Sequence, residues 1–281
     1  YDSGGAPVRD GFQIAGYRDV IDRLEAAGIE ARIVDADFGS YDDPLSHIRE
    51  VPVPEFIDFP EWDTYWVHDT ILDPDVLINV PVMKTHSPHL TACLKNHIGI
   101  AAGARYGTYK GVGGPNPGDP PGLHKGWPEK DSVIREIIDL SAIARPEYNV
   151  VDAIVCKEKY KSTNGTTIRR NIVLAGPDMV AVDTVCARLM GLNPQDADHV
   201  CRAAREGLGT NDPDRITVVG EKTVEESMFY FEHSPKGFQS SRGYFGRTPP
   251  VWLLNRVEGT DFDMTKDIGA GPYSCPYRWR P

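Results

Sequence analysis

The sequence has no run of eighteen apolar residues and too few basic residues to balance its acidic ones. A transmembrane helix needs about 20 apolar residues, so a membrane span is excluded. Thirty Lys and Arg residues against 41 Asp and Glu residues leave a formal charge of −11. Proteins that bind nucleic acid without sequence preference need a basic surface, so we expect no nucleic-acid partner.

Cysteines are few and widely spaced. No Cys-x-x-Cys motif occurs, so this chain encodes neither a zinc knuckle nor a self-contained iron–sulfur cluster. Cys93, Cys156 and Cys186 have apolar neighbours and are expected to pack as small hydrophobic residues. The chain starts at Tyr1 without a signal-peptide pattern, which indicates a trimmed or processed product. We expect a soluble protein, either cytoplasmic or exported with its signal removed.

Two catalytic or phosphate-binding motifs are also missing. No Gly-x-Ser-x-Gly elbow is present, which disfavours a serine hydrolase of that type. Residues 103–129 are rich in Gly and Pro, but no strand leads into them and no Gly-Lys-Ser/Thr follows. A segment of this length is more typical of a lid over a ligand. Its candidate ligand contacts are Arg105, Tyr109, Lys110 and His124.

Helix and strand patterns alternate along residues 1–220, which predicts an α/β core domain with a largely parallel sheet flanked by helices. Helix, Gly28 and strand follow one another at the start, as in half of a βαβ unit. Asn164-Gly165 indicates a hairpin. The expected helices are 15–27, 90–98, 132–143, 178–190 and 195–206, and the expected strands are 31–36, 75–80, 148–155, 171–175 and 215–219.

Residues 221–281 form an irregular C-terminal arm that is rich in aromatic residues. Aromatic side chains at this density need to be covered, so the arm packs either on the core or on another subunit. A homo-oligomer or a redox partner bound through this arm is therefore a possible assembly. The aromatic residues are Phe229, Tyr230, Phe231, Phe238, Tyr244, Phe245, Trp252, Phe262, Tyr273, Tyr277 and Trp279.

Residues 75–99 contain the largest cluster of side chains that could bind a ligand or take part in catalysis. A buried-strand pattern is followed directly by amines, imidazoles, hydroxyls and an amide, at the position where open α/β sheets bind ligands. A lysine at a strand end can hold a carboxylate or phosphate, and the start of the next helix adds a positive dipole end. The alternative is that the lysines are simply solvated. The residues are Lys84, Thr85, His86, His89, Thr91, Lys95, Asn96 and His97.

His86 and His89 have a spacing that suits two ligands of one metal ion, and His97 could be a third. Imidazole suits Zn, Fe or Ni, and a carboxylate such as Asp152 or Asp178 could complete the set. The alternative is that these histidines cap helices or bind backbone carbonyl groups. A divalent metal is therefore one of two interpretations of the pair.

Two aspartates follow the strand pattern 171–175. Asp178 is placed to cap the next helix. Asp183 lies among apolar residues, where a carboxylate needs a partner. A buried salt bridge between Asp183 and a lysine of the 75–99 segment would serve structure or catalysis. Asp152, at the end of a predicted strand, has the same ambiguity.

The ordered set of motifs resembles the domain-of-unknown-function 362 family over roughly residues 15–220. The resemblance implies an α/β fold and no established reaction. Many members of that family carry ferredoxin-type cysteine repeats or twin-arginine export signals, and this chain shows neither. The matching motifs are Lys84-Thr-His86, Thr91, Lys95-Asn96-x-x-Gly99, Val151-Asp152-Ala-Ile, Leu174-Ala-Gly-x-Asp178-x-Val-Ala-Val-Asp183, Met190-Gly191, Gly207-Leu-Gly209 and Ile216-x-Val-Val-Gly220.

Two functions fit these observations. The first is an enzyme acting on a small anionic substrate, a carboxylate or phosphate, by acid–base or metal-assisted chemistry. The second is a non-catalytic partner or carrier subunit of a redox or maturation complex, docked through residues 221–281. For the enzyme, the expected catalytic residues are Lys84, His86, Lys95 and Asp183, the ligand contacts are Thr85, Thr91, Asn96, Arg105, Lys110 and His124, and the metal ligands are His86, His89 and Asp152.

Overall fold

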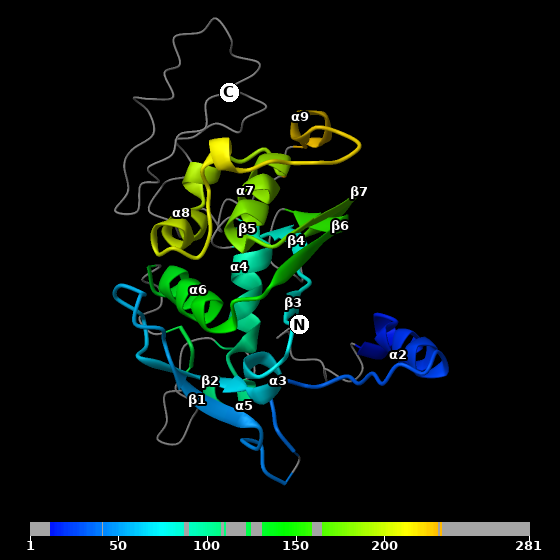
Figure 1. Ribbon diagram of the computed structural model, residues 1–281, viewed down its shortest axis with the longest axis vertical. Helices are drawn as coiled ribbons and strands as arrows, with labels where there is room; N and C mark the ends of the chain where they lie inside the picture. Colours follow the sequence, from blue (N-terminus) through cyan, green and yellow to red (C-terminus); the bar gives the residue numbers. More distant parts are fainter. Residues whose placement is uncertain are drawn as a thin grey trace, which may run out of the picture.

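The computed structural model describes residues 12–40, 42–86, 90–107, 110, 122–124, 131–158, 165–229 and 231. A mixed five-stranded sheet lies at the centre of the molecule (Figure 1). Its strands are β3 (Ile78–Asn79), β4 (Val82–Thr85), β5 (Leu90–Thr91), β6 (Tyr148–Glu158) and β7 (Thr166–Gly176).

The directions of the strands correct the prediction of a largely parallel sheet. β3 and β4 run parallel to β6, whereas the β4–β5 and β6–β7 pairs are antiparallel. The reason is loop length, because connections of a few residues can join only antiparallel neighbours. The predicted strand 148–155 is confirmed and extends to Glu158, and the predicted strand 171–175 is confirmed within β7.

The expected strand 75–80 is interrupted. β3 covers only Ile78–Asn79, and the same line of chain resumes as β4 after Pro81. Pro81 has no N–H to donate to a ladder, but its carbonyl oxygen accepts a hydrogen bond from Asp152 N at 2.8 Å. The proline therefore separates two short strands, β3 and β4, which pair with the same edge of β6. Lys84 and Thr85 lie at the end of β4.

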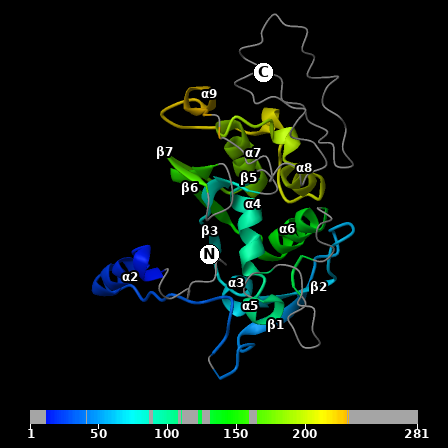
Figure 2. The same cartoon turned by 180° about the vertical axis from the view of Figure 1, so that it is seen from behind.

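The long helices pack on one face of this sheet. They are α6 (Asp131–Ala144), α7 (Met179–Leu189) and α8 (Asp198–Arg205), with the short α4 (Cys93–Asn96) between them. Figures 1 and 2 show these four helices together on the same side of the strands. Alternate residues of β6 such as Val151 and Ala153 are buried beneath them. The predicted helices 132–143 and 178–190 are confirmed as α6 and α7.

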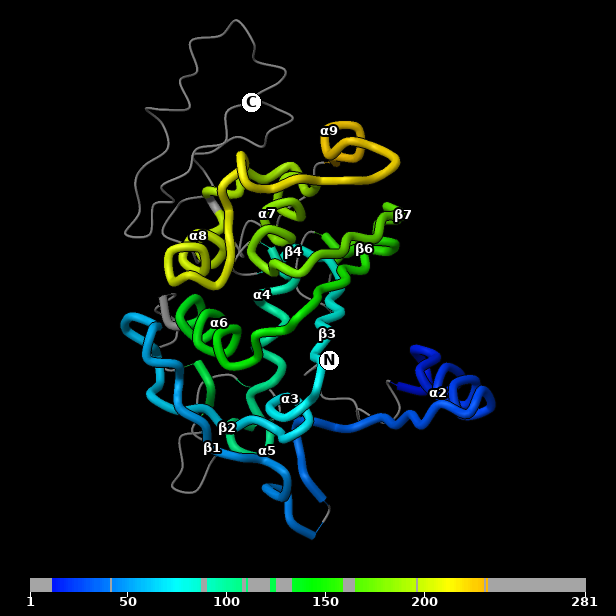
Figure 3. The backbone as a smooth tube through the Cα atoms, viewed as in Figure 1, coloured from blue at the N-terminus to red at the C-terminus, as the bar shows by residue number. Residues whose placement is uncertain are grey.

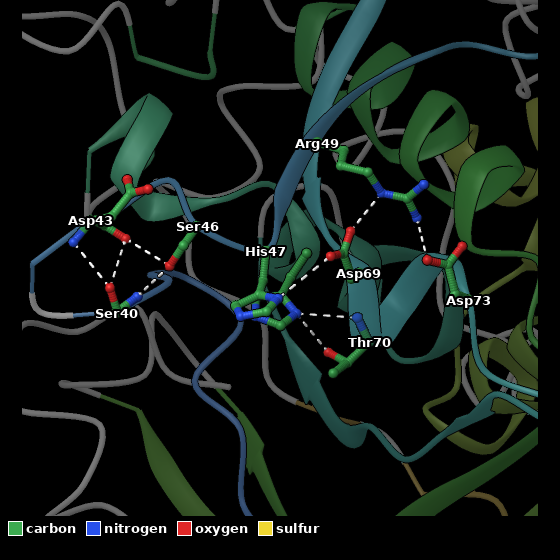
Figure 4. A network of polar contacts seen from close by, with 9 residues as sticks. Ser40, Asp43, Ser46, His47, Arg49, Asp69, Thr70 and Asp73 are labelled. Carbon is green, nitrogen blue, oxygen red and sulfur yellow. Dashed lines mark hydrogen bonds and ion pairs between the residues drawn. The ribbon is translucent and has the colours of Figure 1, made fainter.

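A second, two-stranded antiparallel sheet joins β1 (Ile48–Pro52) to β2 (Thr64–His68). β2 leads into α3 (Asp69–Leu72), whose first turn is capped by the His68 ring: Nδ1 accepts a hydrogen bond from Thr70 N at 3.1 Å. Arg49 on β1 reaches Asp69 and Asp73, and His47 lies 3.6 Å from Asp69 (Figure 4). These contacts fasten β1 and β2 to α3.

α2 (Tyr17–Ala26) confirms the helix predicted over 15–27. Its apolar residues recur at helical spacing, and Gly28 ends it with φ +78, a left-handed conformation that glycine adopts without strain. All ten residues of α2 are at least partly exposed. Figure 1 shows this helix standing apart from the sheet.

Four further elements differ from the sequence prediction. Residues 31–36 and 215–219 carry strand-like sequence but no ladder pairing among the described residues, because a strand needs a neighbouring edge as well as propensity. The expected helix 90–98 is divided into β5, α4 and η1 (His97–Ile100). The expected helix 195–206 is divided into η2 (Pro194–Asp196) and α8. The remaining short elements are α5 (Gly103–Tyr106), η3 (Pro213–Arg215) and α9 (Val224–Ser227).

One hydrophobic core includes buried residues from Val53 to Phe231. The first part of the predicted C-terminal arm lies against α7 and the turn after it, since Phe229 N donates to Leu189 O and Phe231 N donates to Met190 O. The arm's other aromatic residues and its Cys275 lie outside the described residues. In the described part of the chain, no helix is long and apolar enough to cross a membrane.

Candidate functional site

Lys95 and His86 lie at the centre of the candidate site. His86 follows β4 directly, and Lys95 lies in α4, which follows β5; because β4 and β5 pair antiparallel, the two residues lie close together. The Lys95 Nζ lies 2.6 Å from His86 Nδ1. In this contact the amine donates to the imidazole nitrogen. The structure therefore brings together two of the four residues that the sequence predicted as catalytic.

His199 in α8 is a buried histidine near Lys95 that sequence reasoning did not single out. Its side chain is fully buried, and neither ring nitrogen has a hydrogen-bond partner in the part of the chain that the structure describes. Burial, reinforced by the positive charge of nearby Lys95, lowers the pKa of His199 to about 3. His199 is therefore a neutral imidazole with one donor and one acceptor nitrogen.

Two threonines beside the strand end have buried hydroxyl groups. Neither Thr85 Oγ1 nor Thr91 Oγ1 meets a hydrogen-bond partner among the described residues. The β4–β5 register pairs Lys84 with Thr91 and Thr85 with Leu90. Residues directly opposite share a face of the ladder, so Thr85 faces the buried side and Thr91 faces the side of Lys84.

Asp183 holds the first turn of α4 in place. It is fully buried in α7, and its carboxylate accepts hydrogen bonds from Cys93 N at 2.7 Å and Leu94 N at 3.0 Å. Burial raises the pKa of Asp183 to about 7, while these two N–H donors act in the opposite direction. The expected partner of Asp183 was a lysine, and the backbone amides preceding Lys95 take that place. Asp183 is therefore a positioning residue for the helix that carries Lys95.

Asn96, the residue after Lys95, begins a chain of side-chain amides. Asn96 Nδ2 donates to Asn79 Oδ1 at 2.7 Å, and Asn79 Nδ2 donates to Asn149 Oδ1 at 3.0 Å. Asn149 Nδ2 then donates to the carbonyl oxygen of Gly176 at 3.3 Å. This amide chain connects α4 to β3, β6 and the end of β7.

Asp178 is confirmed as the N-cap of α7. One carboxylate oxygen accepts from Val180 N and Ala181 N, and the other accepts from Thr210 N at 2.8 Å. The carboxylate thereby joins the start of α7 to the Gly207-Leu-Gly209 motif. A Cβ atom at Gly209 would collide with this carboxylate, which explains the glycine.

Gly209→Ala is therefore expected to destabilise the protein by about 1–3 kcal/mol, the usual effect of overpacking a tight site. Chemical denaturation measures the change. Gly220→Ala is the matched control, because its Cβ would meet only ordinary van der Waals contact. An equal loss of stability in both variants would contradict this explanation of Gly209.

Four other predicted site residues have partners of their own. Arg105 stacks over the Trp66 ring at 5.6 Å, and Lys110 is ion-paired with Asp37 at 3.0 Å. His124 Nδ1 lies 2.6 Å from Glu136 Oε2, and Asp152 Oδ1 accepts from Ile154 N at 2.8 Å. The roles of Arg105, Lys110 and His124 as ligand contacts and of Asp152 as a metal ligand stay predictions. His89 and Tyr109 lie outside the described residues.

The metal hypothesis also stays a prediction. Within the described ranges, no three His, Cys, Asp or Glu side chains gather closely enough to hold a metal ion. His97, the expected third ligand, has Nδ1 2.9 Å from Ser141 Oγ, and Asp178 is occupied as a helix cap. Because His89 lies outside the described residues, the geometry does not test whether His86 and His89 share a metal ion. The metal content of the purified protein tests it.

Comparison with known proteins supports the family resemblance. A "Thylakoid-associated protein" of Synechocystis sp. is 23% identical over 181 residues, which cover 60% of this chain and 50% of that protein. The chain thus spans about half the length of the curated relative it matches. No solved structure matches it. The profile of the family described as "Domain of unknown function (DUF362)" matches residues 3–188, and the chain belongs to that family.

Proposed function

We propose that the Lys95 site binds a small anion, a carboxylate or a phosphate, and carries out acid–base chemistry on it. The observation that supports this is the buried His199 ring beside the positive charge of Lys95, with both nitrogens unpartnered among the described residues. Buried polar groups in native proteins are nearly always hydrogen-bonded. An anion that accepts from the His199 N–H would give that ring a partner, and the charge of Lys95 would balance the charge of the anion.

In this proposal the two imidazoles have different roles. His199 is neutral and buried, so it donates a hydrogen bond without adding charge, while Lys95 supplies the charge. His86 is held against Lys95 at 2.6 Å and is the group placed to exchange a proton with the bound molecule. Asp183 keeps α4, and therefore Lys95, in position through the Cys93 and Leu94 amides.

Calorimetric titration with inorganic phosphate and with malonate tests the binding step. A charge-assisted hydrogen bond contributes about 2–3 kcal/mol, so Lys95→Met should weaken binding by about 30- to 150-fold. His199→Phe should also weaken it, since the ring keeps its size but loses both nitrogens. Lys222→Met, at an exposed turn, is the control and should bind as wild type. Equal affinity of wild type and Lys95→Met for both anions would overturn the proposal.

If the reaction is metal-assisted, the protein must also bind a divalent metal ion, and this is tested separately. If a divalent ion takes part, the purified protein should contain Zn, Fe or Ni in a fixed ratio, and His86→Ala should lower that ratio. Elemental analysis of both proteins measures it. A wild-type protein without metal that still binds the anions supports plain acid–base chemistry at the same site.

The alternative function is that of a partner or carrier subunit. It is favoured by the thylakoid association in the name of the Synechocystis relative. It predicts that deletion of residues 232–281 dissolves an assembly, while Lys95→Met changes no ligand or metal signal. Native mass spectrometry of both variants distinguishes the two functions.

A further inference from the structure

Two lysines lie side by side on the face of the central sheet that is turned away from the long helices. Lys84 on β4 is the register partner of Lys157 on β6. Thr91 on β5 pairs with Lys84, and Thr167 on β7 pairs with Lys157. Residues opposite one another share a face of a sheet, so these four side chains form one row across four strands. We call this set the lysine row.

A bulge in β6 places Lys157 in this row. The β6–β7 register shifts between Ala153 and Val155, and the β4–β6 register shifts at the same point. Ala153 is buried beneath the helices before the shift, and Cys156 is buried there after it, so the alternation of faces changes by one residue. With regular alternation, Lys157 would face the helices as Ala153 does. Bulges are frequent next to active sites, where they re-aim a side chain.

The lysine row concentrates positive charge. Neighbouring strands are only about 4.8 Å apart, and like charges directly opposite one another destabilise a sheet. Arg169 on β7 is the diagonal neighbour of Lys157, because it lies two residues after Thr167 on the same face. Asp152 is the one carboxylate among the described strand residues of this face, and it pairs with Val82. Three cations therefore face one carboxylate here, although the whole chain has a formal charge of −11.

The hydroxyl group of Thr91 is an independent indication of a ligand. The Thr91 residue is only 8% exposed, and its Oγ1 has no hydrogen-bond partner in the part of the chain that the structure describes. Buried polar side chains in native proteins are nearly always hydrogen-bonded. The register places this hydroxyl beside Lys84 on the same face. A bound oxyanion would accept a hydrogen bond from Thr91 and balance the charge of the two lysines.

The position of the row in the sheet agrees with a binding site. Lys84 and Lys157 lie near the carboxyl ends of β4 and β6, which run parallel. Ligands of open α/β sheets bind outside the carboxyl ends of the strands. Figure 3 shows β4, β6 and β7 next to one another, with α4 and α7 to one side of them. Lys95 belongs to α4, so the lysine row and the Lys95 site lie on different faces of the sheet.

We propose that the lysine row binds a phosphoryl group, with Lys84 and Lys157 on its oxygens and Thr91 donating a hydrogen bond to it. A phosphoryl group fits better than a carboxylate, because two amines and the diagonal Arg169 match a dianion with three oxygens, whereas a carboxylate has one charge and two oxygens. The group belongs either to free phosphate or to a phosphate monoester. This site is separate from the Lys95 site and does not depend on the function proposed above.

Calorimetric titration with inorganic phosphate in the Lys95→Met background tests the proposal without the Lys95 site. The measurement is made at low ionic strength, because salt screens exposed charges. The background protein should bind phosphate, and adding Lys157→Met should weaken binding about tenfold or more, the effect of losing one charge-assisted hydrogen bond. Thr91→Val keeps the shape of the side chain without the hydroxyl and should also weaken binding. Lys157→Arg, which keeps the charge, should retain most of the affinity.

Lys222→Met in the same background is the control and should leave phosphate binding unchanged. Titration with phenyl phosphate then identifies the source of the group: a monoester that binds as well as phosphate indicates a phosphorylated molecule, and binding of phosphate alone indicates the free ion. Absence of phosphate binding in the Lys95→Met protein, or equal affinity after Lys157→Met, would overturn the proposal. Loss of the Lys95 site alone would contradict only the function proposed above.

Lysine acetylation of the wild-type protein provides a test that needs no variant. Limited acetylation with and without saturating inorganic phosphate is followed for each lysine by peptide mass spectrometry. Phosphate should slow acetylation of both Lys84 and Lys157 severalfold, since their amines contact the bound oxygens, and should leave Lys222 unaffected. Unchanged rates at Lys84 and Lys157, with or without protection of Lys95, would show that the lysine row does not bind the anion.

Discussion

Asp183→Ala should destabilise the protein by about 3–5 kcal/mol at pH 6. The substitution removes a fully buried carboxyl group whose oxygens accept hydrogen bonds from Cys93 N and Leu94 N. Each buried donor left unsatisfied costs about 1–3 kcal/mol, and a cavity adds to the loss. Urea denaturation measures the difference. Asp183→Asn keeps one acceptor oxygen and should lose clearly less stability than Asp183→Ala.

The difference in stability between wild type and Asp183→Asn is expected to depend on pH. The pKa of Asp183 is raised from 3.8 to about 7 in the folded state, chiefly by burial. The folded protein therefore favours the protonated carboxyl. Its contribution is fully present below about pH 4 and is lost as the pH rises through 7. The stability of wild type minus that of Asp183→Asn should fall between pH 4 and pH 8, and a difference independent of pH would contradict this.

Lys110→Met should destabilise the protein by about 3–5 kcal/mol, the effect of leaving one charge of a buried pair uncompensated. Lys110 Nζ lies 3.0 Å from Asp37 Oδ1 and donates to the carbonyl oxygen of Gly99 at 2.6 Å. Burial lowers the pKa of Lys110 to about 8 and raises that of Asp37, so the environment disfavours both charges. Each charge then depends on the other.

A double-mutant cycle tests the dependence. Lys110→Met combined with Asp37→Asn should be destabilised by less than the sum of the two single variants. Arg49→Met provides the contrast, since the Arg49 side chain is half exposed and its ion pairs with Asp69 and Asp73 lie at the surface. Such pairs contribute about 0.2–1 kcal/mol. Additive single effects at Lys110 and Asp37 would show that the pair is not coupled.

The sequence predicted those parts of the fold that depend on local signals. α7 has an N-cap at Asp178 and a continuous apolar pattern, and both are confirmed. Residues 31–36 have strand propensity as well, but a strand also needs a partner edge from a distant part of the chain. Propensity does not encode that edge. The antiparallel β4–β5 pair was not predicted, because β5 lies where the sequence indicated the start of a helix, whereas the Asn164-Gly165 signal agrees with the antiparallel β6–β7 pair.

The residues of the candidate site were likewise predicted only in part. Lys95 and His86 were predicted together because they belong to one short segment of the chain. His199 was missed because it lies about 100 residues later, in a segment predicted only as a short helix, and nothing in the local sequence connects it to Lys95. The backbone partners of Asp183 could not be predicted either, since they appear only when α4 meets α7.

The chain of amides that runs from Asn96 through Asn79 and Asn149 to Gly176 has all its N–H groups pointing the same way. A strand that slipped by one residue would turn Asn79 or Asn149 toward the opposite surface and break several of these bonds at once. The aligned amide dipoles therefore favour one register of these short strands over the others. That register is the one in which Lys95 lies beside His86.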